Sequence, residues 1–565
     1  MLLKRLYEYS ERITDLSPQL YAKTRIDWLI DIDLDGNLLG FVEQHADPEG
    51  KKRGMLRDAP NVVRTSGVKP TLLVDNTKYV LGWQPDAKKP ERVTQCQAAF
   101  LELARKCQEA TELISVGVVV KFLEENQRCP VEPPEGMKPG DNLTFRIGDE
   151  LIVDNAKIQA WWAEAGMDEK YLVDGTCMLT GIKGKVLKVL PLPVKGIPGE
   201  QAEYYMISAN SSVFESYGLC ASQIAPLSIT AAERFTKALN HLLRNEQTHM
   251  RFGKVVYAFW TRDEQEYDWL QPLHSPELKH VEMLLKSPFS SKGVQDVDTT
   301  AFYAAAFSSS GSRIVVRDWI ETTVGKVKAN LARWFRLMTL HDTKGEARYY
   351  GIYPLAACLY HDANRDMVAN VPRALLSCAL AGTRLPDWLL FQAIKRNRAE
   401  QGLTRPRATL FKMILHNHYG NPEEDYMSEL VMEKPAEWEQ AAYDAYLCGR
   451  LLAVLDGIQS IAIPGAQATM IDRYYGTASS APATVFGTLL RGAQNHLAKF
   501  RKDKKGLYIF FSKQLEEIIG RLTIGFPTTL SLKQQAMFSL GFYHQRAWRK
   551  ADTTANKGND IKEDN

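Results

Sequence analysis

The sequence predicts an α+β fold, with a mixed α/β N-terminal region and an all-α helical bundle toward the C-terminal end. Two patterns in the 565-residue chain support this prediction: strand-like alternation in about the first 90 residues, and helical periodicity that dominates beyond about residue 345. A chain of this length is expected to contain two to four domains, at roughly 100–200 residues each. We therefore place a mixed α/β region at 1–345 and a helical domain at 346–565, with a bundle from about 427.

The N-terminal region begins with the pattern of a β-hairpin. Residues 26–34 (IDWLIDIDL) alternate apolar and polar side chains, as a half-buried strand does. Asp35 and Gly36 then predict a tight turn, and the apolar run 38–42 predicts the second strand. Residues 62–82 read as a polar loop, an apolar run, a turn at Asp75 and Asn76, and another short strand.

Further elements follow in order up to residue 345. Apolar residues recur at helical spacing over 92–125, a Pro-rich connector spans 129–139, and 176–225 is rich in Gly, Pro and Ser and should be irregular. Ser228 is placed to cap a helix that runs to Leu243. Strands are predicted at 143–147, 254–260 and 312–320.

The C-terminal region is predicted to be helical. Helical spacing is found at 371–380, 387–398, 435–461, 481–500, 511–522 and 531–549. The apolar stripe on 435–461 is typical of core packing in a bundle. The tail 551–565 is polar, lacks large apolar residues, and is predicted to be disordered.

Composition sets limits on function. The net charge is only +3, so nucleic-acid binding would have to come from local clusters rather than from an overall basic excess. The eight cysteines include no Cys-x-x-Cys pair, which argues against a structural zinc site and fits reduced, buried thiols. We find no signal-peptide pattern and no apolar run of transmembrane length, so we expect a cytoplasmic protein without a membrane partner.

Motifs for catalysis are largely missing. The P-loop, dinucleotide-binding, zinc-protease and nucleophile-elbow patterns do not occur, so we expect no enzyme, no cofactor and no metal. Two His-Asp dipeptides, at 341–342 and 361–362, leave one alternative open. Such pairs occur in metal-dependent nucleases, where His and Asp hold an ion that activates water.

Three basic clusters are candidates for nucleic-acid contact, because Lys and Arg neutralise phosphates and Asn can pair with base edges. A solvated surface remains the alternative for each. The first cluster, between 64 and 78, contains Arg64, Ser66, Lys69, Asn76 and Lys78. The second contains Lys395, Arg396, Arg398, Arg405, Arg407 and Lys412. The third, predicted as a loop between two bundle helices, contains Lys499, Arg501 and Lys502.

Several short motifs, in their order and spacing, resemble one known family. They are RTSGV at 64–68, LVDN at 73–76, YVLG at 79–82, LTG at 179–181, KGIPG at 195–199, ISAN at 207–210, SYG at 216–218, YAFW at 257–260, YLCGRLLA at 446–453, IDRYY at 471–475 and GFYHQR at 541–546. Together they resemble the large subunit of the type I-C CRISPR Cascade complex along nearly the whole chain.

The resemblance implies a non-catalytic subunit of a crRNA-guided surveillance complex. Its partners would be the backbone and crRNA-end-binding subunits, duplex target DNA with its displaced single strand, and a separate helicase-nuclease. It would recognise the protospacer-adjacent motif, with the first cluster as the motif-binding site and the other two as DNA-backbone contacts. The C-terminal bundle resembles a small subunit, and Met427 and Met432 are plausible internal starts for a separate copy. A purely structural subunit is the remaining alternative.

Overall fold

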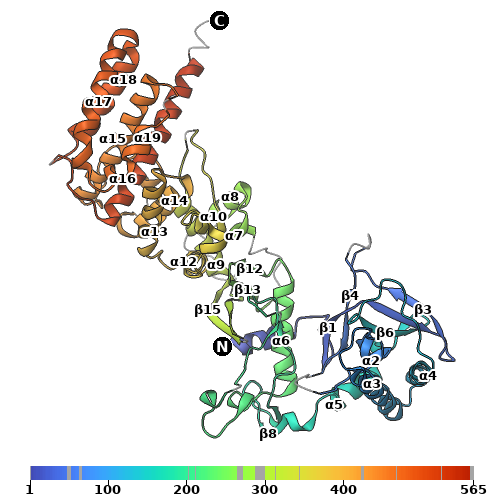
Figure 1. Cartoon of the computed structure of the whole chain (residues 1–565). Helices are drawn as coiled ribbons and strands as arrows, with labels where there is room; N and C mark the ends of the chain where they lie inside the picture. Colours follow the sequence, from blue (N-terminus) through green and yellow to red (C-terminus); the bar gives the residue numbers. More distant parts are fainter. Residues whose placement is uncertain are drawn as a thin grey trace. The chain divides into compact units, whose positions relative to one another are not determined.

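The computed structural model describes residues 2–47, 52–62, 67–201, 203–209, 211–263, 271–286, 299–311, 313–342, 344–420, 425–465, 467–523 and 525–559. It forms two compact units. The first unit comprises 1–245 with 307–317, and the second comprises 246–306 with 318–565. The first unit combines several sheets with helices, and the second is mainly helical, which confirms the α+β class (Figure 1).

The division between the units lies at residue 245, not at the 345 expected from the sequence. The reason is packing. Strands β12 (His249–Phe252), β13 (Val255–Thr261) and β14 (Ala301–Ser310) contribute apolar side chains to the same core as the helices that follow them. Tyr257 and Phe302 of these strands, for example, share that core with Trp334. A change from strands to helices along the chain therefore does not mark a change of core.

The first unit is organised around one mixed sheet with the strand order β3-β2-β6-β5. Its strands are β2 (Trp28–Ile32), β3 (Leu38–Glu43), β5 (Val74–Asn76), β6 (Asn142–Ile147) and the short β7 (Glu150–Leu151). β2 and β3 form the predicted hairpin, with Gly36 at φ +83°, which glycine adopts without strain. β2 and β6 are parallel, and the other pairs are antiparallel.

Two helices pack on this sheet through aromatic contacts. The predicted helix at 92–125 is two helices, α3 (Pro90–Thr111) and α4 (Ile114–Arg128), separated where Glu112 adopts φ +53°. Phe100 of α3 and Phe122 of α4 both contact Phe145 of β6, with ring centroids 6.5 and 5.9 Å apart. The two helices therefore share one attachment point on the sheet.

The remainder of the first unit consists of shorter elements and one long helix. The helices are α1 (Leu2–Ser10), α2 (Thr77–Val80), α5 (Ala156–Ala165) and α6 (Ile229–Arg244). The strands are β1 (Tyr21–Ile26), β4 (Met55–Pro60), β8 (Leu172–Thr176), β9 (Lys183–Leu187), β10 (Val194–Lys195) and β11 (Glu203–Tyr204). Ser228 caps α6 by accepting from the Ala231 amide, as predicted.

The backbone of Leu20 joins three parts of the first unit. Its N–H donates to both carboxylate oxygens of Glu233 on α6, at 3.0 Å each. Its carbonyl accepts from the Trp162 indole of α5 at 3.1 Å and from the backbone N–H of Asn61 at 2.7 Å. Leu20 adopts φ +57°, an uncommon conformation for a side chain of this type. These hydrogen bonds offset the free energy that the left-handed backbone conformation of Leu20 costs.

The Glu233 carboxylate is itself neutralised by a buried lysine. Lys237, one turn along α6, pairs with it at 2.9 Å and also donates to the carbonyls of Ser17 and Pro18. Burial raises the pKa of Glu233 and lowers the pKa of Lys237, and their mutual attraction opposes both shifts. The pair therefore fastens α6 to the segment that leads into β1.

A four-stranded sheet, in which β12 and β13 are antiparallel, precedes most of the helices of the second unit. The sheet has the order β12-β13-β14-β15, with β15 spanning Arg313–Thr323. The sequence predicted β13 and β15 but missed β12 and β14. The helices are α7 (Gln271–His274), α8 (Leu278–Lys286), α9 (Val324–Met338), α10 (Ile352–Ala357), α11 (Ala363–Asp366), α12 (Asn370–Ala381), α13 (Trp388–Glu400), α14 (Arg405–Tyr419), α15 (Gln440–Ala462), α16 (Met470–Ala478), α17 (Pro482–Asp503), α18 (Lys505–Gly520) and α19 (Leu532–Asn559).

Helix α15 is the centre of the C-terminal bundle. Its Arg450 is 1% exposed and forms an ion pair with Glu517 of α18 and a 2.8 Å hydrogen bond with Gln545 of α19. By length and composition alone α15 could cross a membrane, but 78% of its most apolar window is buried within the fold. The stripe predicted to be core packing is buried along α15.

The bundle is not a separate core that begins at 427. The apolar core of the second unit runs without a break from the sheet to α19. Helix α19 packs against α13 and α14 as well as against α15. It continues to Asn559, so it covers nine residues of the tail predicted to be disordered; the segment 551–557 contains neither glycine nor proline, so nothing in it breaks a helix. Residues 560–565 lie outside the described residues.

Two glycines set the close crossing of α15 and α19. A Cβ at Gly449 would overlap the carbonyl oxygen of Phe538, and a Cβ at Gly541 would overlap that of Tyr446. We predict that Gly449→Ala lowers the free energy of unfolding by about 1–3 kcal/mol or more, because two backbones must separate. Thermal or urea unfolding measures this. The matched control is Gly487→Ala on α17, where the Cβ meets open space and a gain of up to about 1 kcal/mol is expected.

His544 of α19 makes stability depend on pH. Burial, reinforced by the charges of Lys412 and Arg450, lowers the pKa of His544 to about 3 from 6.5. Between pH 6.5 and 3 the unfolded chain binds a proton here that the folded chain does not, so stability falls as the pH drops. The contribution is about 1.4 kcal/mol per pH unit. We predict that His544→Gln flattens the dependence of the unfolding free energy on pH. Equal slopes in wild type and His544→Gln would contradict this.

Candidate nucleic-acid interface

The first basic cluster lies where β5 meets α2, not in a hairpin loop. Asn76 is the last residue of β5 and the N-cap position of α2, and Lys78 is the second residue of that helix. The backbone N–H of Lys69 donates to the hydroxyl of Tyr79, also on α2, at 3.2 Å. The structure therefore brings Lys69, Asn76 and Lys78 to one junction. Arg64 and Ser66 lie outside the described residues.

This junction corrects the expected strand–turn–strand pattern. The side chain of Asp75 accepts from the backbone N–H of Thr71, and its other oxygen from that of Asn76. The carbonyl of Asp141 accepts from the N–H of Thr77, the first residue of α2. These bonds stabilise a strand that passes directly into a short helix. Local turn propensity alone does not reveal them, because Asp141 is remote in sequence.

Tyr171 is a residue of this surface that sequence reasoning missed. Its hydroxyl lies 3.0 Å from the Lys69 ammonium, and its ring lies under two cations: Lys69 Nζ at 4.7 Å and Lys170 Nζ at 5.0 Å from the centroid. Asp168 pairs with Lys170 at 2.5 Å. Two ammonium groups on one ring repel each other, and an added anion would relieve that repulsion. No sequence motif links Tyr171 to Lys69, which is 102 residues away.

Most of the second cluster is used inside the fold. Arg407 is 3% exposed, pairs with Glu400 and donates to Asn397 at 2.7 Å. Lys412 is fully buried and pairs with Asp425 at 2.7 Å; burial lowers the pKa of Lys412, and Asp425 opposes that shift. In this conformation neither side chain is placed to contact DNA.

Arg396 and Arg405 are also held by internal partners. Arg396 pairs with Glu400 along α13. Arg405 forms an ion pair with Asp342 at 3.1 Å and donates to the carbonyls of Leu340 and Glu346. Of the predicted residues in this cluster, Lys395 and Arg398 are the exposed ones. The high local count of cations in the sequence therefore overstates the basic surface.

The third cluster forms the exposed end of a helical hairpin. Figure 1 shows α17 and α18 side by side, and Lys504 alone joins them. The predicted loop is instead the C-terminal end of α17, which carries Lys499, Arg501 and Lys502, all exposed. Within the part of the chain that the structure describes, no ion pair involves these three side chains. We call residues 499–505 the basic tip.

The placement of charge at the basic tip is not explained by helix stability. Cations in the last turn of α17 interact favourably with its helix dipole. Lys504 and Lys505, however, begin α18, where cations are unfavourable, and no acidic residue lies in its first turn. No side chain caps the start of α18. An external polyanion would offset this cost.

The two His-Asp dipeptides lie in different settings. Asp342 accepts from the backbone N–H groups of Lys344 and Glu346 and pairs with Arg405; burial raises the pKa of Asp342, but these bonds outweigh it and lower the value. Asp362 caps α11 by accepting from the Arg365 amide. Among the described residues, no group of three or more His, Cys, Asp or Glu side chains is arranged to hold a metal ion.

The comparison with known proteins covers both units. The sequence pattern of a family described as CRISPR-associated protein (Cas_Csd1) matches residues 3–550. No curated protein matches the chain. The match includes the β5–α2 junction, the internally paired arginines and the basic tip, so all three candidate surfaces are part of the region the family shares. The chain therefore belongs to the Cas_Csd1 family of CRISPR-associated proteins.

Proposed function

We propose that this protein is the large subunit of a crRNA-guided Cascade complex of the type I-C kind. It recognises the protospacer-adjacent motif in duplex DNA, promotes strand separation, holds the displaced strand and recruits a separate helicase-nuclease. Guide pairing reads the remaining target sequence, a division of labour known from another RNA-guided effector. The protein acts in the cytoplasm and leaves DNA cleavage to its partner.

The observation that carries this proposal is the gathering of Lys69, Asn76 and Lys78 at the β5–α2 junction. Asn presents both a donor and an acceptor to a base edge, and Lys presents donors to phosphates or to guanine. Tyr171 fixes the position of the Lys69 ammonium, which lowers the entropy lost on binding. A rigid strand-to-helix junction suits direct readout better than a flexible loop.

The basic tip supports the second part of the proposal, retention of the displaced strand. Its cations are exposed and held on two helices joined by a single residue. A single strand is bound without sequence preference when cations follow its backbone. Neutralised phosphates release counterions, so this binding weakens as salt rises.

Motif recognition predicts a selective loss when the junction is altered. In the assembled complex, Lys69→Ala and Asn76→Ala should each weaken binding to duplexes with the correct motif by about tenfold or more, since one good base contact contributes about 1–3 kcal/mol. Binding to duplexes that lack the motif should change little. Lys183→Ala, at an exposed lysine on β9, is the matched control. A gel shift with both duplexes measures the effect. Wild-type binding by both variants would reject the assignment and favour a purely structural subunit.

Strand retention predicts a change in salt dependence. The triple variant Lys499→Gln, Arg501→Gln, Lys502→Gln of the full chain should bind single-stranded DNA less tightly. Its plot of log affinity against log salt should be shallower by about 2, at about 0.7 per lost phosphate contact. The control is Lys279→Gln, Lys326→Gln, Arg365→Gln, which removes three exposed cations elsewhere in the second unit. If both triple variants shift the slope equally, the tip has no special role.

A further inference from the structure

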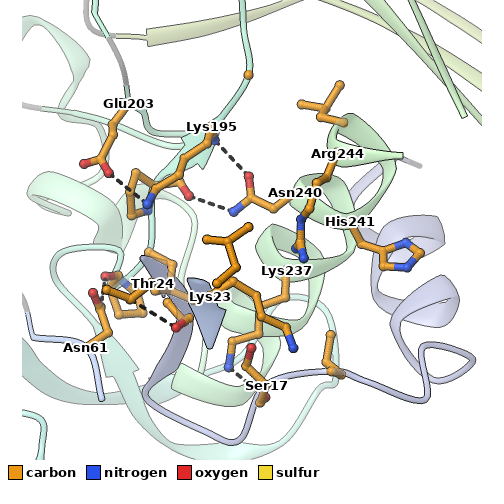
Figure 2. Close-up of a pocket in the computed structure, with 18 of the residues that line it drawn as sticks. Ser17, Lys23, Thr24, Asn61, Lys195, Glu203, Lys237, Asn240, His241 and Arg244 are labelled. Carbon is orange, nitrogen blue, oxygen red and sulfur yellow. Dashed lines mark hydrogen bonds and ion pairs between the residues drawn. The ribbon is translucent and has the colours of Figure 1, made fainter. Parts of the chain in front are cut away.

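The first unit contains a pocket of roughly 600 Å³ that the proposed motif recognition does not use. Its size lies within the about 300–1,000 Å³ that is typical of small-molecule sites. Figure 2 shows its labelled side chains converging from several elements: Lys23 and Thr24 from β1, Lys195 from β10, and Arg244 from the end of α6. All of its lining residues belong to the first unit.

Hydrogen bonds fix the walls of this pocket. Asn240 of α6 accepts from the Lys195 amide at 2.8 Å and donates to the Pro193 carbonyl at 3.0 Å. Asn61 donates to the Pro191 carbonyl, also at 3.0 Å. The proline-rich loop that ends in β10 is therefore tied both to the helix and to the segment that follows β4. The pocket is a formed feature of the fold, not a gap between loosely placed loops.

One cation in the pocket has no internal anion. Lys23 pairs with Asp58 at 3.1 Å, and Lys195 pairs with Glu203 at 3.4 Å. Lys237 directs its ammonium to Glu233 and to two carbonyls of the preceding loop. Arg244 is exposed and has no ion pair among the described residues. Its positive charge is felt within the site: burial, together with Arg244, lowers the pKa of His241, while Asp15 opposes the shift.

Part of the remaining lining is apolar, and the other part is polar and includes the carboxylates of Asp15 and Glu203. Leu16, Leu56, Leu192 and Leu243 face the same space as the cations, together with the rings of the proline-rich loop. Apolar walls with an unpaired arginine and a fixed lysine suit a ligand that has a flat apolar part and an anionic part. A nucleotide has this division: its base is planar and stacks on apolar surface, and its phosphate pairs with arginine in a bidentate manner.

We propose that this pocket accepts one unstacked nucleotide, with its base against the apolar walls and its phosphate at Arg244. The inference rests on the proposed function only for the origin of the bound nucleotide. We assign the nucleotide to a single strand that the complex handles, and a free nucleoside monophosphate is the other possible origin. Lys195 and Asn240 position the site, and Arg244 supplies the charge that an anionic ligand requires.

The experiment uses the full chain and a single-stranded DNA that carries one 2-aminopurine, whose fluorescence rises when the base leaves the stack. Binding should raise the fluorescence. Arg244→Gln should lower affinity for the strand about tenfold, because a hydrogen bond to a charged group contributes about 1.5–3 kcal/mol, and it should abolish the fluorescence rise. Arg244→Lys should restore part of both. The matched control is Arg128→Gln, since Arg128 is likewise an exposed arginine at the last position of a helix and does not line the pocket.

The outcomes separate this inference from the proposed function. Competition by deoxyadenosine monophosphate alone, without a fluorescence rise on the strand, identifies the free nucleotide as the source. Equal behaviour of the Arg244→Gln and Arg128→Gln variants, or no fluorescence change with any ligand, overturns the inference. Neither result affects motif recognition, which is measured with duplex DNA and the Lys69→Ala variant. Conversely, if Lys69→Ala leaves motif binding unchanged, the fluorescence assay still tests the pocket.

Discussion

The first unit depends on a buried carboxylate that is neutralised by a lysine one helical turn away. Both carboxylate oxygens of Glu233 accept from the backbone N–H of Leu20, and Lys237 pairs with that carboxylate while it donates to the carbonyls of Ser17 and Pro18. Loss of one partner from a buried pair of this kind costs about 3–5 kcal/mol, because the other charge remains without compensation. The course of the chain into β1, and with it one wall of the pocket, follows from this pair.

The cations of this protein serve two different purposes, and sequence alone does not separate them. Arg407, Lys412 and Arg450 are buried and joined to carboxylates, so they stabilise the packing of helices. The cations of the basic tip are exposed and form no ion pair among the described residues. A basic run within a helix contributes to a nucleic-acid surface only where its side chains are exposed. Most of the predicted cations on α13 and α14 taken together are instead paired inside the fold.

Much of the fold could be predicted from the sequence, because its elements are set by local patterns. The hairpin at Gly36, the cap at Ser228 and the apolar stripe of α15 are such patterns, and each is found as expected. The boundary between units was misplaced, because it depends on which core the sheet joins. The candidate site was only partly predictable. Position in sequence indicated Lys69, but its partner Tyr171 is set by tertiary contact, and no pattern in the chain marks it.

Under the proposed function, the internal pairing of so many charges has a consequence for the approach to DNA. With a net charge of +3, the chain as a whole is attracted only weakly to a polyanion. The field near its surface is uneven, and cations concentrated at a helical tip exert a torque as well as a pull. If the protein binds DNA as proposed, this torque turns it during its approach, so that encounters begin in one orientation. Weak overall attraction then also limits the time spent on unrelated DNA.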